Sequence, residues 1–123
     1  MRIESLAPGE IFVFGSNSYG AHGGGAARFA YDRFGAVWGQ AEGLQGRSYG
    51  IDTMSGPVVF EEQAARFVRF AVEHPELRFL VTEVGCGIAG YASEDVADFF
   101  AGAPDNVVLP DSFVRVLERG AER

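Results

Sequence analysis

Two glycine-rich segments, each following an apolar run, carry the residue types best suited to chemistry in this chain. The first leads from Phe14-Gly15-Ser16-Asn17 to His22-Gly23-Gly24-Gly25, and the second is Gly85-Cys86-Gly87-Ile88-Ala89-Gly90-Tyr91. Glycine lets backbone N–H groups approach an anion closely, and a helix that begins after such a segment adds the positive end of its dipole. The two segments therefore predict a phosphate site built from backbone amides.

The charged residues exclude several other kinds of phosphate site. The formal net charge is −7, and all ten basic residues are arginine, because no lysine occurs. A phosphate-loop lysine and a lysine Schiff base are thereby excluded, and so acidic a chain is not expected to bind nucleic acid. A phosphatase loop around Cys86 would need a nearby arginine to clamp the phosphate, but none occurs between Arg78 and Arg115.

Length and composition predict one folded domain over residues 1–123. These residues suffice for one hydrophobic core, and 47% of them are hydrophobic. One cysteine and two histidines cannot supply an ordinary structural zinc site, so the sequence predicts neither a metal nor a cofactor. No apolar run approaches the ~20 residues of a membrane span, and the first residues lack the apolar centre of a signal peptide. We therefore expect a cytoplasmic protein with no membrane partner.

Alternating strand-like and helix-like segments must position the two glycine segments. Apolar runs predict strands, and residues at helical spacing predict helices. A strand–helix order of this kind predicts a three-layer α/β/α sandwich around a largely parallel, mixed sheet, with ligands at the carboxyl ends of the strands. The glycine-rich residues 35–46 are expected to form a loop. The expected strands are 10–15, 47–53, 77–84 and 106–109, and the expected helices are 24–34, 60–74, one from Ser93 and one from Asp111.

The second segment also fits a dinucleotide-binding motif. Gly85 to Gly90 matches G-x-G-x-x-G, and Asp111 follows at roughly the offset of a ribose-binding acid. The helix-start signal, however, is Ser93, after the last glycine, whereas a dinucleotide fingerprint needs its third glycine inside the helix. A Rossmann-type NAD-binding protein is therefore a lower-ranked alternative.

Taken together, the two segments resemble the signature of the macrodomain family. In that family a strand ends in an Asn-bearing turn, a triple-glycine loop opens the next helix, and a G-x-G-hydrophobic-x-G turn follows a central strand. Asn17, the triple glycine from Gly23 and the run from Gly85 to Gly90 match these features in order. Residues 44–53 look like the intervening strand, which often ends in threonine. The likeness covers residues 9–117 and implies a macrodomain-like fold.

The resemblance implies a cleft for ADP-ribose, either free or attached to a substrate. Asn17 would hydrogen-bond the distal ribose, Tyr91 would stack near a ribose, and His22 is a further candidate for ligand contact. The two glycine loops would hold the diphosphate through their backbone. These loop residues are Gly23, Gly24, Gly25, Gly85, Cys86, Gly87, Ile88, Ala89 and Gly90.

Hydrolysis of an ADP-ribosyl bond is a second hypothesis. The pattern is most similar to the compact branch that removes terminal ADP-ribose from proteins with a lysine and an aspartate. Met54 and Ala89 occupy those positions here, so the lysine-dependent route is excluded. Another carboxylate would have to act near the ribose, and Glu42 is the best candidate, ahead of His22 and Asp52.

The leading hypothesis is thus binding of ADP-ribose or a related NAD-derived nucleotide. In a third hypothesis the glycine turns are structural, and the chain is an interaction or assembly subunit.

Overall fold

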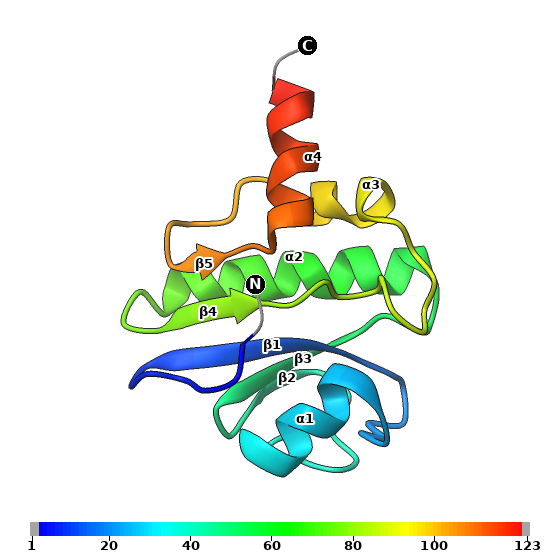
Figure 1. Ribbon diagram of the computed structural model, residues 1–123, viewed down its shortest axis with the longest axis vertical. Coiled ribbons are helices and arrows are strands. Elements are labelled where there is room, and N and C mark those ends of the chain that lie inside the picture. Colours follow the sequence, from blue (N-terminus) through cyan, green and yellow to red (C-terminus); the bar gives the residue numbers. More distant parts are fainter. Residues whose placement is uncertain (1–2, 122–123) are drawn as a thin grey trace.

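The computed structural model describes residues 3–121, and its centre is a single five-stranded sheet in the order β2-β3-β1-β4-β5 (Figure 1). Four strands run parallel and the edge strand β2 is antiparallel to β3. The chain therefore has the predicted α/β fold with a mixed, mostly parallel sheet. The strands are β1 (Glu10–Ser16), β2 (Gly43–Gln45), β3 (Ser48–Asp52), β4 (Arg78–Val81) and β5 (Val107–Val108).

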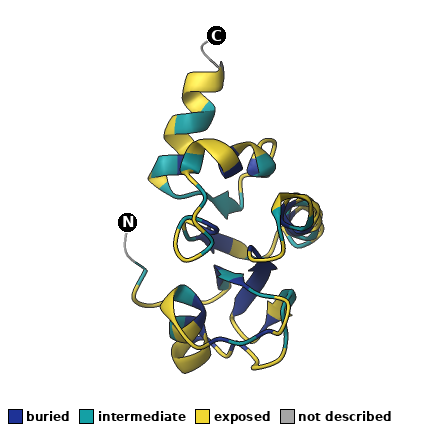
Figure 2. Ribbon diagram, turned by 90° about the vertical axis from the view of Figure 1, so that its right-hand side faces the viewer, coloured by how far each residue is buried: buried dark blue, intermediate teal, exposed yellow. Residues whose placement is uncertain are grey.

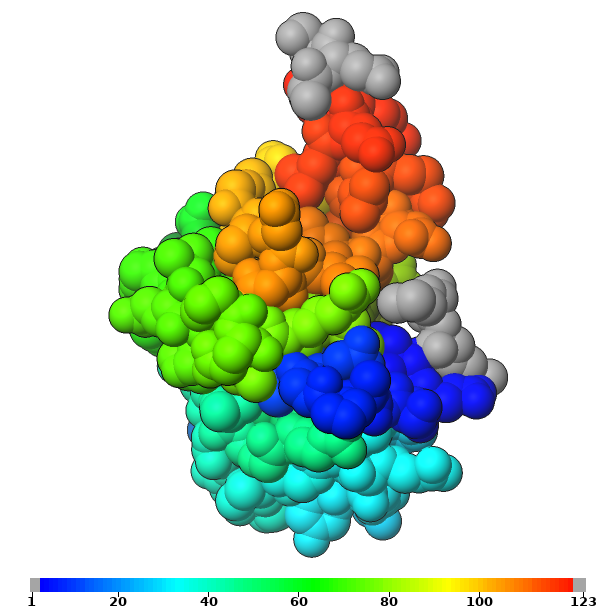
Figure 3. Space-filling model, turned by 90° about the vertical axis from the view of Figure 1, so that its left-hand side faces the viewer, coloured from blue at the N-terminus to red at the C-terminus, as the bar shows by residue number. Residues whose placement is uncertain are grey.

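A helical segment follows each parallel strand, as crossover connections between parallel strands require. In Figure 1, α2 runs alongside β4 and β5, and α1 lies at the other end of the molecule, below β1. The last helix extends beyond the rest of the molecule (Figure 3). The segments are α1 (Gly25–Arg33), α2 (Pro57–Glu73), α3 (Ser93–Val96) with the 3₁₀ helix η1 (Ala97–Phe100), and α4 (Asp111–Ala121).

Alternate residues of β1 pack into two separate hydrophobic clusters. Phe12 and Phe14 join the side chains of α1, whereas Ile11 and Val13 join those of α2, η1 and α4. Because both sides of β1 are covered, its sequence is apolar throughout rather than alternating. The buried residues accordingly concentrate on the strands and the helix faces turned toward them (Figure 2).

The structure differs from the sequence-based expectation at three element boundaries. The short strand β2 lies within the predicted loop at residues 35–46, where Gln45 is buried but Leu44 is exposed. A three-residue strand next to glycines has too little alternation to be recognised. β4 ends at Val81, three residues earlier than expected, and α2 begins at Pro57, since proline suits the first turn of a helix.

The segment preceding β2 supplies hydrogen bonds to the strand's own backbone. Gln40 donates from Nε2 to the carbonyl oxygens of Glu42, at 3.1 Å, and Leu44, at 3.0 Å. A side chain therefore satisfies carbonyl groups at this edge of the sheet. Among the helices within residues 3–121, none is both long and apolar enough to cross a membrane.

Candidate ligand-binding cleft

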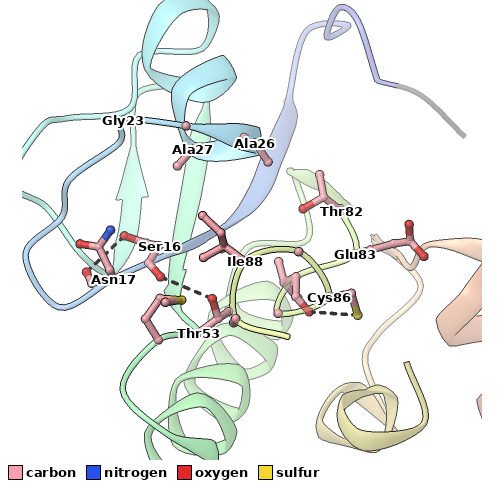
Figure 4. A pocket seen from close by; sticks show the side chains of 18 of the residues that line it. Ser16, Asn17, Gly23, Ala26, Ala27, Thr53, Thr82, Glu83, Cys86 and Ile88 are labelled. Atoms are coloured by element: carbon pink, nitrogen blue, oxygen red, sulfur yellow. Dashed lines mark hydrogen bonds between the residues drawn. The ribbon is translucent and has the colours of Figure 1, made fainter. Parts of the chain in front are cut away.

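A cleft of about 710 Å³ opens at the carboxyl ends of β1, β3 and β4, between the two glycine loops (Figure 4). This is the edge of a parallel sheet where ligands are expected to bind. Most of the predicted ligand-binding residues line the cleft. They are Asn17, Gly23, Gly24, Gly25, Gly85, Cys86, Gly87, Ile88 and Ala89.

The side chain of Asn17 shapes the turn at the start of the first loop. Its Oδ1 accepts hydrogen bonds from the backbone N–H groups of Tyr19 and Ala21, both at 3.1 Å, and its Nδ2 donates to the Ala21 carbonyl at 2.8 Å. An amide group has two N–H donors. Asn17 thus holds the turn and keeps one donor for a ligand in the cleft.

The first loop ends where α1 begins, with unpaired backbone donors. The first main-chain bond into this helix is donated by Arg28 to the carbonyl of Gly24, at 3.2 Å. No side chain caps the helix at Gly24. The N–H groups of the first helical turn, from Gly25 to Ala27, therefore lack intrahelical acceptors, as at any helix start, and these residues line the cleft.

The second loop uses three of its amides to hold its own shape. Cys86 donates to the Glu83 carbonyl at 3.1 Å, Gly90 to that of Gly87 at 3.0 Å, and Tyr91 to that of Gly85 at 2.9 Å. Cys86 and Gly90 therefore do not offer free N–H groups, contrary to what the resemblance implied. The N–H groups of Gly87, Ile88 and Ala89 have no acceptor within the part of the chain that the structure describes.

Gly85 occupies a position that only glycine fits. Its φ is +81°, and a Cβ placed on it would lie 2.5 Å from the ring of Phe60, which is fully buried. The second loop therefore packs directly on α2. This contact fixes the height of the loop above the sheet.

His22 lies beside the cleft rather than in it. Its ring is completely buried, and Nε2 lies 2.8 Å from the Val37 carbonyl and 3.2 Å from Oε1 of Gln45. Both partners are acceptors, so Nε2 must carry the hydrogen. The other ring nitrogen, Nδ1, has no partner within residues 3–121. His22 thus anchors the first loop, and its predicted ligand contact is not made from this position.

Three further predicted residues also lie outside the cleft lining. Tyr91 packs against Phe60 with ring centroids 5.6 Å apart, and Gly90 closes the second loop. Glu42, the candidate catalytic carboxylate, receives two hydrogen bonds from Arg66, at 2.8 and 3.0 Å, in a separate groove. Glu42 therefore has no access to a ligand in the cleft.

Several residues that line the cleft were not predicted as ligand contacts. Thr53 follows β3, and its hydroxyl donates to the Ser16 carbonyl at 3.4 Å; Thr82 follows β4, and its hydroxyl donates to the Val13 carbonyl at 2.8 Å. Both belong to the carboxyl ends of parallel strands, which is the signal that could have identified them. The remaining side chains are Ser16, Ala21, Ala26, Ala27, Met54, Glu83 and Val84, with Gly15.

The cleft has no pair of groups suited to acid–base catalysis. Glu83 is its one charged lining residue within residues 3–121, and the carboxylate accepts a hydrogen bond from Ser112. The Asp52 carboxylate is occupied by the Met54 N–H, at 2.9 Å, and the Ser55 hydroxyl, at 2.6 Å. No cluster of three or more metal-binding side chains occurs in the described chain.

The thiol of Cys86 is not an activated nucleophile. Burial raises its pKa above the usual value, although a hydrogen bond with Ser93 opposes the shift. The sulfur also lies 3.8 Å from the Val84 carbonyl, to which the S–H donates. A thiol with a raised pKa carries little of the reactive thiolate at neutral pH.

A second hollow of about 560 Å³ continues from the cleft toward the start of α4. It shares Gly25, Ala26, Thr82 and Glu83 with the cleft. Phe12, Phe29, Val81 and Pro110 give it apolar walls, and Asp111, Ser112 and Arg115 add polar groups. The two hollows adjoin, so that the cleft with its backbone donors lies next to a hollow of mixed apolar and polar lining.

Comparison of the chain with protein-family models, with curated proteins and with solved structures finds no significant match.

Proposed function

We propose that the cleft binds ADP-ribose or a related NAD-derived nucleotide, with the diphosphate between the two glycine loops. The observation that carries the proposal is the set of unpaired amides of Gly87, Ile88 and Ala89, which line the same cleft as the first turn of α1. Successive free N–H groups and a helix start are the backbone's means of binding phosphate. Among residues 3–121, no arginine lines the cleft to do this instead, and the chain contains no lysine.

The cleft and the adjoining hollow support a nucleotide rather than a free phosphate ion. A diphosphate held by the amides would leave its distal ribose near Asn17 and its nucleoside in the adjoining hollow, where Phe12 and Phe29 offer apolar surface. The two hydrophobic clusters on opposite sides of β1 also support the three-layer, macrodomain-like architecture that the sequence resemblance implies.

Binding without turnover fits the cleft better than hydrolysis. Met54 lines the cleft at the position where the macrodomain branch that removes terminal ADP-ribose has its lysine. Ala89 stands at the position of that branch's aspartate. Glu42, the alternative acid, is paired with Arg66 outside the cleft. A nucleotide held there would meet hydrogen-bond donors, and Glu83, the one lining carboxylate within residues 3–121, already accepts a hydrogen bond from Ser112.

Calorimetry with ADP-ribose tests the proposal. Gly24→Val and Gly87→Val place side chains in open space at the two loops, because neither residue has a positive φ and a Cβ on either meets no atom within 4 Å. Both variants should fold normally and lose ADP-ribose binding by about tenfold or more, since a side chain there blocks the approach of phosphate to the amides. Gly120→Val, in equally open space on α4, is the matched control and should bind like the natural chain.

A ligand series then identifies the recognised parts of the nucleotide. ADP-ribose should bind more tightly than ADP, and ADP more tightly than ribose 5-phosphate, because each step removes a group that fits the cleft or the adjoining hollow. A folded protein that gives no heat with millimolar ADP-ribose, or loop variants that bind as well as the Gly120→Val control, would contradict the proposal.

A further inference from the structure

A separate groove of about 430 Å³ lies between α2 and the sheet edge formed by β2 and β3. It shares no lining residue with the proposed nucleotide cleft. Tyr49 and Gly43 contribute from the sheet, Arg66, Arg69, Phe70 and Glu73 from α2, and Glu42 from the segment before β2. The four α2 residues are spaced as one stripe of a helix, so they face the groove together.

The hydroxyl of Tyr49 is the unusual feature of this groove. Only 4% of the residue is exposed, and its ring packs between Phe67 and Phe70, with centroids 5.1 and 5.3 Å away. No hydrogen-bond partner for the hydroxyl exists among residues 3–121. Among the residues that the structure describes, the one fully buried polar side-chain atom without a partner is His22 Nδ1, so the Tyr49 oxygen is open to the groove, where water or an entering molecule can bind it.

The hydroxyl acts as a donor at neutral pH. Burial, aided by the charge of Glu42, raises the pKa of Tyr49 to about 12, although Arg66 and Arg69 lower it. Glu42, Arg66 and Arg69 all line the same groove as Tyr49. The protonated phenol can therefore donate a hydrogen bond to an acceptor on the entering molecule.

Charges of both signs flank the hydroxyl, and only some of them are paired. Arg66 and Glu42 neutralise one another in a two-point ion pair, with N–O distances of 2.8 and 3.0 Å. Arg69 and Glu73 form no ion pair within the described chain, although they stand four residues apart on α2. One free cation and one free anion thus remain at the rim, with the apolar ring of Phe70 in the same lining.

We propose that this groove is a binding site for a small zwitterion of the amino-acid class. Its carboxylate would accept from the Tyr49 O–H and pair with Arg69, its ammonium group would pair with Glu73, and an apolar side chain would lie on Phe70. A free dianion such as inorganic phosphate is disfavoured, because Glu42 and Glu73 repel it.

Three matched probes test the proposal on the whole chain by NMR. Leucine carries both charges, isocaproate is the same skeleton without the ammonium group, and isoamylamine is the skeleton without the carboxylate. Leucine should shift the Tyr49 ring and Arg69 side-chain signals saturably and bind more tightly than either analogue. Inorganic phosphate should bind more weakly than leucine.

Variants separate the contribution of each group. Tyr49→Phe keeps the ring packing and should weaken leucine binding by about tenfold, the effect of losing one hydrogen bond to a charged group. Arg69→Gln should remove the preference for leucine over isoamylamine, and Glu73→Gln the preference over isocaproate. Arg28→Gln, which changes a surface arginine of α1, is the control and should bind as the natural chain does.

Two results would overturn the proposal. One is the absence of saturable shifts at Tyr49 and Arg69 at about 0.1 M leucine, a concentration at which even a single charged hydrogen bond would register. The other is equal affinity for leucine, isocaproate and phosphate with no effect of Glu73→Gln, which would indicate a simple anion site. Gly87→Val, which blocks the nucleotide cleft, should leave leucine binding unchanged.

Discussion

His22 connects the first glycine loop to the edge of the sheet through one ring nitrogen. Its Nε2 donor serves the Val37 carbonyl and Gln45, and Gln45 in turn accepts from the Val37 N–H at 2.8 Å. The bond to Gln45 is buried and the bonds to Val37 are partly buried, so a lost donor leaves acceptors that water reaches poorly. The histidine therefore contributes stability at the same place where it positions the loop.

We predict that His22→Leu lowers the free energy of unfolding by about 1–3 kcal/mol, because it removes the donor to the Val37 carbonyl and one of the two donors to Oε1 of Gln45. His22→Gln retains an N–H donor near the position of Nε2 and should lose less. Urea unfolding measures the difference. Equal losses in the two variants would indicate that ring packing against Phe14, with centroids 5.2 Å apart, outweighs the hydrogen bonds.

Cys86 provides a chemical probe of the cleft. Its raised pKa predicts slow alkylation by iodoacetamide at neutral pH, with a rate that continues to increase with pH beyond the usual thiol pKa. Because Cys86 lines the cleft, ADP-ribose should slow the reaction further. Rapid labelling at neutral pH that ADP-ribose does not change would argue against both the buried thiol and the proposed position of the ligand.

At the level of elements, the second loop depends on its contact with α2. Gly85→Ala should destabilise the fold by about 2–4 kcal/mol, since the new Cβ meets the buried Phe60 ring and the residue must also keep a positive φ. Gly102→Ala is the matched control, because Gly102 has a similar φ of +79° but open space around a Cβ. The difference between their thermal midpoints isolates the steric contribution.

If Gly85→Ala and Gly102→Ala lower the thermal midpoint equally, the second loop can move away from α2 without cost. The contact between Gly85 and Phe60 then does not set the height of the loop above the sheet.

The four parallel strands and the long helices could be predicted from the sequence because their apolar patterns are local. β1 and α2 follow directly from the spacing of residues such as Phe60, Ala64 and Phe67, all of which are buried. The positions of Glu42 and His22 could not be predicted in this way. Both depend on how residues 35–46 return to the sheet as β2, and that path is set by contacts with residues distant in sequence.

The cleft could be predicted from the sequence only in part. The glycine loops were found from composition and order, whereas Thr53 and Thr82 enter the cleft only because the parallel register brings the ends of β3 and β4 beside β1. Which loop amides remain free also required the structure, because Cys86 and Gly90 donate to other residues of the chain.

For the molecule as a whole, the negative net charge should oppose binding of the anionic nucleotide. The net charge is −7, and Glu83 is the one charged lining residue of the cleft within residues 3–121. We predict that the affinity for ADP-ribose rises by about two- to threefold between low and physiological ionic strength, since salt screens the long-range repulsion. Calorimetry over a salt series measures the slope. An affinity that falls with salt would instead indicate a cationic side chain at the phosphate.

The Gln40 side chain, which bonds to the edge strand β2, also affects how two molecules can pair through their sheet edges. An open sheet edge is a template on which a second chain can add a strand. By occupying the carbonyls of Glu42 and Leu44, Gln40 removes acceptors that such a strand would need. A single amide side chain thereby leaves fewer acceptors for edge-to-edge pairing with a second chain.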